Sequence, residues 1–173
     1  MTKPHVFLSG PPHIGKTTAL LRVVESFPVD WAGFITKAVL QQNLKIGLEI
    51  VTSGGSRHRV ASRTQTGRQA PYTLHESELT DALNMAFSNR TEDSFVYLDE
   101  INSLFCQSCV FINELSRLLG SRCVVAVVAR KGHPILQDLW KRNDIRAFDL
   151  DAAQRDTIPG EIAEYLKATH GNN

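Results

Sequence analysis

The sequence has little of what marks secreted, membrane-spanning or nucleic-acid-binding proteins. No apolar run approaches the roughly 18 residues that a transmembrane helix needs, and the first residues show no apolar core of a secretory signal. Lysine and arginine number 19 against 18 acidic residues, so the net charge of +1 gives no reason to expect nucleic acid or a membrane as a partner. We therefore expect a globular protein of a reducing compartment, the cytosol or the nucleus.

Cysteine is also scarce, with three residues in a chain of 173. Cys106 and Cys109 form a C-x-x-C pair, but no second pair of cysteines or histidines lies near them in sequence to complete a tetrahedral zinc site. Cys123 stands alone in the apolar run 123–128. We expect all three to be buried structural residues, and a redox or metal-binding role of the pair is the alternative.

The sequence does contain a phosphate-binding loop. Gly10–Thr17 has the form G-x-x-x-x-G-K-T, after a short apolar run and before a segment whose apolar residues have helical spacing. In this strand–loop–helix setting, backbone N–H groups point inward around phosphate oxygens, assisted by the positive end of the helix dipole. We expect the nucleotide to be bound by Gly10, Pro11, Pro12, His13, Ile14, Gly15, Lys16, Thr17 and Thr18.

Two of these residues have more specific expected roles. Lys16 reaches the β- and γ-phosphates and neutralises charge during catalysis, and Thr17 offers its hydroxyl to Mg²⁺. The other half of a hydrolysis site is the apolar run 95–98 followed by Asp99 and Glu100. At the carboxyl end of a buried parallel strand, Asp99 is expected to hold Mg²⁺ through water, and Glu100 to orient or deprotonate the attacking water. The alternative is that Asp99 only caps the next helix.

Between these two motifs the period of the apolar residues changes to two. Alternation on either side of a turn at 41–43 predicts an antiparallel hairpin, with Leu44 on its apolar face and Lys45 on its polar face. A T-x-x-E capping box at Thr73 then predicts the start of a helix. We therefore expect an antiparallel β-rich insertion, at about 33–73, in an otherwise parallel α/β fold.

One cluster of positive charge lies in this insertion. Its five members are Arg57, His58, Arg59, Arg63 and Arg68. Three interpretations stay open: a solvated strand edge whose charge discourages aggregation, a cover over a bound triphosphate, and a nucleic-acid patch. The last lacks the interleaved aromatic residues on which bases stack.

A further catalytic candidate follows the apolar strand expected at 123–129. Open α/β sheets bind their ligands at the carboxyl ends of the strands, and Arg130 and Lys131 come directly after this strand. Arg130 or Lys131 is therefore a candidate for contacting the γ-phosphate in cis, as an arginine finger does, and we assign this catalytic role to Arg130. The alternative is a solvated turn after a strand.

Together these segments resemble the cancer-related nucleoside-triphosphatase group, the THEP-type P-loop NTPases. The resemblance extends from His5 to about Pro159, and its carriers are Gly10–Thr18, Gly33–Thr36, Ile46–Thr52, Val96–Ile101 and Lys131–Pro134. It implies a single RecA-like α/β domain spanning 1–173, with a mainly parallel central sheet flanked by helices. It also implies Mg²⁺-dependent hydrolysis of several nucleoside triphosphates, ATP and GTP among them, to diphosphate and phosphate.

The resemblance covers the site residues, with three departures, one of which is that Lys37 and Ala38 stand where the family favours acids. Lys16, Thr17, Asp99 and Glu100 match the family's phosphate, metal and catalytic positions, whereas His13 stands where the family usually has glycine. The segment after Glu100 also lacks a lysine and a glutamate of the family pattern. Two alternatives to hydrolysis use the same phosphate cradle: a nucleotide or nucleoside kinase, and a nucleotide-dependent switch with little turnover. We expect a monomer whose partners are nucleoside triphosphates.

Overall fold

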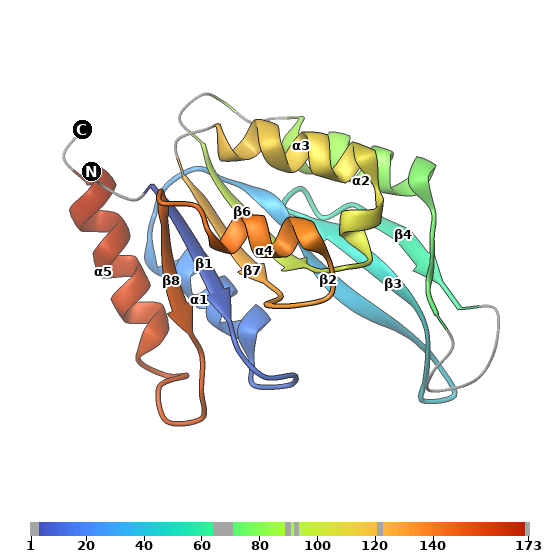
Figure 1. The fold of residues 1–173 in the computed structure, drawn as a ribbon, viewed down its shortest axis with the longest axis horizontal. Coiled ribbons are helices and arrows are strands. Elements are labelled where there is room, and N and C mark those ends of the chain that lie inside the picture. Colours follow the sequence, from blue (N-terminus) through green and yellow to red (C-terminus); the bar gives the residue numbers. More distant parts are fainter. Residues whose placement is uncertain (1–3, 64–70, 89–90, 92–93, 121–122, 172–173) are drawn as a thin grey trace.

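One mixed sheet runs through the molecule (Figure 1). The computed structural model describes residues 4–63, 71–88, 91, 94–120 and 123–171. Within these residues the strands are β1 His5–Ser9, β2 Trp31–Gln41, β3 Leu44–Thr52, β4 Arg57–Ser62, β5 Thr73–Leu74, β6 Phe95–Ile101, β7 Val124–Val128 and β8 Ile145–Asp149. The helices are α1 Lys16–Ser26, α2 Glu76–Phe87, α3 Cys109–Leu119, α4 Pro134–Trp140 and α5 Ile158–His170, with a short 3₁₀ turn, η1, at Phe105–Gln107.

The predicted α/β fold with a mainly parallel sheet is confirmed. The strand order is β5-β4-β3-β2-β6-β7-β1-β8. The pairs β2–β6, β6–β7, β7–β1 and β1–β8 are parallel. β3, β4 and β5 extend the sheet with antiparallel pairs. Helices α1 and α5 cover one face, and α2, α3 and α4 cover the other (Figure 1). This layering leaves the carboxyl ends of the parallel strands at one edge, where loops can meet.

The predicted antiparallel insertion extends the central sheet. β2 pairs in parallel with β6 over its first residues, Trp31–Phe34, and then pairs with β3 in antiparallel fashion from Phe34 to Gln41. One long strand thus belongs to both parts. The β2–β3 hairpin is therefore paired directly, through β2, with β6, the strand that carries Asp99 and Glu100.

Aromatic contacts tie the helices and loops to both faces of the sheet. β7 is buried along its whole length, as expected for a central parallel strand covered on both sides. On one face Phe7 meets Trp140 edge to face, with ring centroids 5.5 Å apart. On the other face Phe27 meets Phe95 at 5.2 Å. Each buried side chain of this kind contributes roughly 1.5–3 kcal/mol by leaving water, so the layers hold the strand ends in defined positions.

Two local predictions in the antiparallel part are wrong. Thr73 does not cap a helix: Thr73 and Leu74 form β5, and α2 begins at Glu76 with His75 before it. The backbone of β4 forms an antiparallel pair with Thr73 and Leu74, and this pairing is favoured over the helix cap that the local motif predicted. Leu44 is 49% exposed rather than buried, because the tip of the β2–β3 hairpin extends beyond the helices that cover the sheet (Figure 1).

The cysteine prediction is confirmed for two of the three residues. Cys106 and Cys123 are buried, and burial raises the pKa of the Cys106 thiol to about 11. Cys109 is exposed at the first residue of α3, so the expectation of burial is wrong there, because the residue lies on the solvent side of the helix. Among the described residues, no group of three or more His, Cys, Asp or Glu side chains could hold a metal ion. In the same part of the chain, no helix combines the length and the apolar character that crossing a membrane requires.

A buried histidine at the start of β1 makes the stability of the fold depend on pH. His5 is 1% exposed, accepts a hydrogen bond from the Val124 N–H at Nδ1, and has its Nε2 3.6 Å from the carboxylate of Asp144. Burial lowers the pKa of His5 more than the charge of Asp144 raises it, and the charges of Arg142 and His170 lower it further.

We expect the part of the free energy of unfolding that depends on His5 to fall as the pH drops below about 6.5, the pKa of an unperturbed histidine. The raised pKa values of Asp99 and Glu100 act in the opposite direction, so this part is the difference between the wild-type protein and His5→Asn. In that range the unfolded chain binds a proton at His5 that the folded chain does not, so acid favours unfolding by up to about 1.4 kcal/mol per pH unit from this group. Urea unfolding at several pH values measures the effect. His5→Asn keeps an acceptor for the Val124 N–H but does not titrate. An equal loss of stability in this variant between pH 7 and 5.5 would refute the assignment to His5.

Candidate active site

The predicted phosphate-binding loop leaves β1 and enters α1 through two glycines that no other residue could replace without cost. A Cβ atom on Gly10 would lie 2.5 Å from the carbonyl oxygen of Leu150, which is closer than real Cβ contacts. Gly15, directly before α1, has a φ of 100°, in the region that side chains disfavour. These two positions bend the chain so that the loop closes over the first turn of α1.

The structure brings together two motifs that lie 82 residues apart in the sequence. The Thr17 hydroxyl, on the first turn of α1, donates to the Asp99 carboxylate, whose two oxygens lie 2.9 and 3.1 Å away. Lys16 precedes Thr17, and its ammonium donates to the carbonyl oxygens of Gly10 and Pro11 at 3.0 and 2.6 Å. A lysine ammonium, a hydroxyl and a carboxylate therefore meet at one edge of the sheet.

Asp99 lies inside the protein, with 2% of its surface exposed. Burial raises its pKa to about 6, although hydrogen bonds from the Thr36 N–H, at 3.2 Å, and from Thr17 favour the charged form. It does not cap the following helix, since the Ser108 hydroxyl accepts from the first turn of α3. The Asn102 side chain accepts the N–H groups at the start of η1. The carboxylate is thus directed toward Thr17 rather than used in a cap.

Glu100 is turned into the open side of the site by a local irregularity of β6. The register with β7 shifts between Leu98 and Ile101, and Glu100 has a φ of 70°. This left-handed conformation costs a residue with a side chain roughly 1–2 kcal/mol, and such strain is often found at functional sites. The carboxylate faces a cavity but has protein on several sides, and desolvation raises its pKa, while Asn102 and Lys45 lower it.

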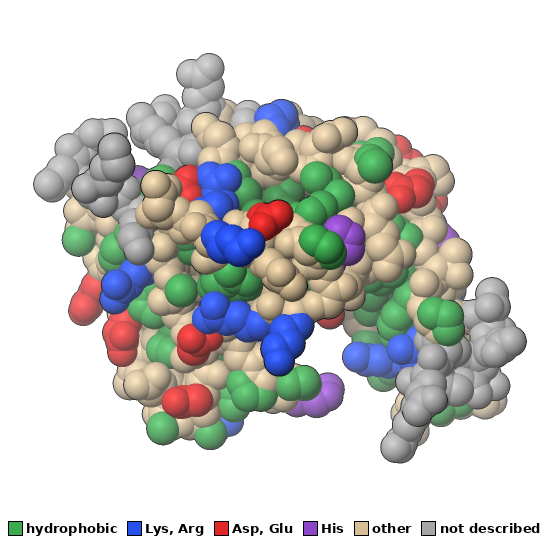
Figure 2. Space-filling model, in the orientation of Figure 1, with side chains coloured by type: hydrophobic (Ala, Val, Ile, Leu, Met, Phe, Trp, Pro, Cys, Tyr) green, Lys and Arg blue, Asp and Glu red, His purple; other side chains and the backbone are tan. Residues whose placement is uncertain are grey.

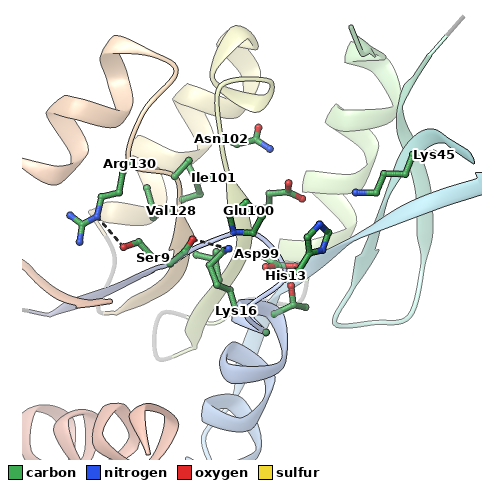
Figure 3. Close-up of a pocket in the computed structure, with 16 residues that line it drawn as sticks. Ser9, His13, Lys16, Lys45, Asp99, Glu100, Ile101, Asn102, Val128 and Arg130 are labelled. Carbon is green, nitrogen blue, oxygen red and sulfur yellow. Dashed lines mark hydrogen bonds between the residues drawn. The ribbon is translucent and has the colours of Figure 1, made fainter. Parts of the chain in front are cut away.

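A cavity of about 690 Å³ connects these groups, within the range usual for ligand sites. Its wall includes six of the predicted nucleotide-binding residues, namely Gly10, Pro12, His13, Gly15, Lys16 and Thr17, together with Asp99, Glu100 and Arg130. Figure 3 shows these side chains converging from β1, α1, β6 and the end of β7. In the space-filling view the surface is deeply indented here, with Lys and Arg side chains on both sides (Figure 2).

Three predicted nucleotide-binding residues lie outside this cavity. Pro11 contributes its carbonyl oxygen to Lys16. Ile14 and Thr18 line a smaller hollow of about 200 Å³ at the side of α1, together with the ion pair of Arg22 and Asp156, whose atoms are 3.1 Å apart. The loop thus separates two hollows that share Gly15.

Arg130 lines the cavity, but its guanidinium is held by other groups. It donates to the Asp149 carboxylate at 2.6 Å and to the Ser9 hydroxyl at 2.9 Å, and it lies 3.6 Å from the ring centre of Trp140. Ser9 in turn donates to Asp149. An approach of Arg130 to a phosphate would require it to give up this ion pair.

The basic cluster of the antiparallel strands does not line the cavity in the described part of the chain. Arg57 pairs with Glu49 at 2.9 Å, and Arg63 lies 4.0 Å from the ring centre of Tyr72. Arg68 lies outside the described residues. The cation that this region does contribute is Lys45, at the start of β3, which was expected only to lie on the polar face of the hairpin.

The comparisons with known proteins agree with this architecture. The model of a family described as NTPase matches residues 5–163, which is most of the chain. The chain belongs to this NTPase family. It is similar to the cancer-related nucleoside-triphosphatase homolog of Bos taurus, with 28% identity over 95% of this chain and 97% of the relative. The nucleoside-triphosphatase THEP1 of Archaeoglobus fulgidus is 27% identical over 94% of this chain and 98% of the relative.

Solved structures show the same fold for this NTPase family member. The crystal structure of THEP1 from Aquifex aeolicus aligns with a TM-score of 0.77 at 21% identity, covering 94% of this chain and 99% of that one. The solution structure of a human cancer-related nucleoside triphosphatase aligns with a TM-score of 0.75 at 24% identity, covering 96% and 98%. The resemblance expected from the motifs is therefore confirmed, and so is the fold that it implied.

His13 gives a physical account of one departure from the family pattern. Its φ is 62°, the left-handed region where glycine is at ease, so this NTPase strains its backbone where glycine would not. We expect His13→Gly to raise the free energy of unfolding by roughly 0.5–1 kcal/mol, since the strain relieved exceeds the extra entropy of glycine in the unfolded chain. Urea denaturation measures this. His13→Ala removes the imidazole but keeps the strain, so an equal gain in that variant would contradict the backbone explanation.

The sequence did not single out four residues that complete the site. Ser9 and Thr36 are short polar residues within strands, Lys45 follows a turn, and Asn102 follows strand β6, so none belongs to a spaced motif. The only available signal for Lys45 was its position opposite the apolar face of the hairpin. Which cavity it lines depends on how the hairpin is attached to β6, and no local pattern encodes that.

Proposed function

We propose that the protein hydrolyses nucleoside 5′-triphosphates, such as ATP and GTP, to diphosphate and phosphate in a Mg²⁺-dependent reaction. The observation that carries the proposal is the contact of Thr17 with Asp99, at 2.9 Å, in a cavity that Lys16 and Glu100 also line. Relatives over nearly the full chain are named nucleoside-triphosphatases, which supports the same reaction class.

The side chains at this point fit Mg²⁺. Thr17 and Asp99 offer a hydroxyl and a carboxylate, which are the hard oxygen ligands that Mg²⁺ prefers, and the two groups are already within hydrogen-bond distance. Two protein ligands are sufficient, because Mg²⁺ keeps several waters and also binds substrate phosphates. When bound, Mg²⁺ would neutralise charge that develops on the phosphate oxygens.

The chain's own residues have separate roles in the proposed mechanism. The backbone N–H groups of the loop between Gly10 and Lys16 surround the phosphates, and Lys16 exchanges its bonds to loop carbonyls for bonds to phosphate oxygens. Glu100 accepts a hydrogen bond from the attacking water and orients it in line with the γ-phosphorus, then takes its proton. Desolvation by the surrounding protein raises the pKa of Glu100, which makes it a better proton acceptor than a fully solvated glutamate.

The contacts of Arg130 make a catalytic role less favourable than its position in the sequence suggested. Its ion pair with Asp149 and its position on Trp140 would have to be broken before it could contact the γ-phosphate. It remains a prediction, and its place on the cavity wall supports a role in shaping the site.

We place the nucleoside near the smaller hollow beside α1. Thr18 lies there, one residue beyond the phosphate-binding Thr17, and the hollow is bordered by the ion pair of Arg22 and Asp156. Because both side chains of this ion pair are exposed, they do not form a rigid pocket that would select one base over the others. This supports the acceptance of several nucleoside triphosphates.

The test is phosphate release by the purified protein with ATP, GTP, CTP or UTP, with Mg²⁺ and with an excess of chelator. We expect release with each nucleotide, and loss of release when the metal is removed. Phosphate recovered on an added nucleoside or nucleotide instead of in solution would identify a kinase. Tight nucleotide binding with no chemical change would identify a switch. We also predict a single domain, a monomer and a location in the cytosol or the nucleus.

A further inference from the structure

The start of β3 carries a cation that lies across the cavity from the phosphate-binding loop. Lys45 follows the hairpin turn Gln42–Asn43 and lines the same cavity as Lys16 and Glu100. In Figure 3 its side chain extends from the hairpin toward the space beside Glu100 and His13. Its charge also lowers the pKa of Glu100, as expected for two groups that share one cavity.

The direction of this side chain is fixed by an irregularity in the hairpin. The register of β2 and β3 shifts so that Val39 faces Gly47 and Leu40 faces Lys45, which leaves Ile46 as a bulge. The bulge is held from the other side, because the Arg63 N–H donates to the Ile46 carbonyl oxygen at 2.9 Å. Bulges of this kind bend a strand and change the aim of the neighbouring side chains.

Lys45 also differs from Arg130 in what binds it. Arg130 is engaged by Asp149, Ser9 and Trp140. For Lys45, no carboxylate of the described residues lies within ion-pair distance, and its side chain is exposed to the cavity. This ammonium, on a flexible stem that extends into the cavity it shares with Glu100, can contact an anion bound there.

We propose that Lys45 contacts the γ-phosphate of the bound nucleotide and stabilises the charge that develops on it. The β2–β3 hairpin then supplies in cis the cation that an arginine finger supplies in other phosphoryl-transfer enzymes. This inference rests on the proposed function, because it assigns a further catalytic residue to the same reaction. It also gives a functional reason for the position of the hairpin, whose strand β2 pairs with β6, the strand that carries Asp99 and Glu100.

The first test compares turnover in Lys45→Ala with that of the wild-type protein. We expect kcat to fall about 100-fold, the usual effect of removing one donor to a charged transition state, and Lys45→Arg to restore most of the rate. Lys167→Ala is the matched control: this lysine is exposed on α5, near the end of the helix where His170 packs on Phe95, far from the loop. We expect its rate to equal that of the wild-type protein, and the melting temperature of all three variants to stay unchanged.

The second test measures binding and does not require turnover. Affinities for ADP and for a non-hydrolysable imido analogue of ATP are measured by calorimetry in the presence of Mg²⁺. If Lys45 contacts the γ-phosphate, Lys45→Ala weakens the triphosphate analogue about tenfold while ADP binding is unchanged, since only the analogue carries that phosphate. Equal weakening of both ligands would indicate a general effect on the site and would overturn the assignment.

The outcomes separate the two proposals. A wild-type protein that releases phosphate, with a Lys45→Ala variant equal to it in rate and in analogue binding, refutes the role of Lys45 and leaves the hydrolase intact. A wild-type protein without turnover refutes the proposed function, and the binding measurement then decides on Lys45 alone. A loss in rate and in analogue binding, restored by arginine, supports the assignment.

Discussion

Lys16→Ala is expected to lower phosphate release from nucleoside triphosphates by about 1,000-fold, the upper range for the loss of one preorganised donor. The ammonium lies against the carbonyl oxygens of Gly10 and Pro11, at the centre of the loop that surrounds the phosphates. No other residue of the described chain lies there to replace it, because Lys45 approaches from the opposite side and Arg130 is paired with Asp149. The measurement is steady-state phosphate release with saturating ATP and Mg²⁺.

A lysine elsewhere on the surface provides the control for this variant. Lys141, at the end of α4, pairs with Asp138 at 3.2 Å and does not line the cavity. Lys141→Ala removes the same charge and should leave the rate unchanged. If Lys16→Ala kept more than about a tenth of the wild-type rate, the loop would not be the site of phosphoryl chemistry, and the proposed function would fail.

Glu100→Gln is expected to reduce kcat by roughly 100- to 10,000-fold, the range for a group that accepts a proton from the attacking nucleophile. The amide keeps the size and the left-handed backbone position of Glu100, with its φ of 70°, but cannot take the proton. Because Glu100 is not a ligand of the phosphates in the proposed mechanism, affinity for ATP should change little. Rapid-quench measurement of the chemical step, together with calorimetry for binding, separates the two quantities.

The matched variant for this prediction is Glu164→Gln on α5. Glu164 is exposed and lies outside the cavity, so this substitution changes the same charge without touching the site. Comparable rates in Glu100→Gln and Glu164→Gln would show that another group handles the water. A parallel loss of ATP affinity in Glu100→Gln would instead place Glu100 among the residues that bind the phosphates.

Local sequence was sufficient to predict the strand, loop and helix elements to which we assign the phosphate chemistry. The loop from Gly10 to Thr17 was predictable because glycine, lysine and threonine at these spacings have few other uses between a strand and a helix. The position of Asp99 and Glu100 near the carboxyl end of β6 was predictable because an apolar run that is followed by two acids marks a buried parallel strand reaching the edge of its sheet. Both predictions depend on contacts within about ten residues of chain.

Local sequence failed where the competing partner comes from elsewhere in the chain. Thr73 matched a helix cap, but the free edge of β4 took it into the sheet. Leu44 alternated like a buried residue, but the hairpin tip has no helix over it. Arg130 lines the cavity, and its contact with a phosphate stays a prediction, but local sequence did not show that Asp149 and Trp140, from β8 and α4, hold its guanidinium.

The sequence by itself determined the α/β class, the glycine-containing loop between β1 and α1, and the place of the acidic pair near the end of β6, since each depends on residues that are neighbours along the chain. Only the tertiary structure decided that Thr17 meets Asp99 at 2.9 Å and that Lys45 faces the same cavity from the β2–β3 hairpin. The reason is physical: hydrogen bonds and packing between distant segments set the directions of side chains, and their energies depend on where the whole sheet places each strand end.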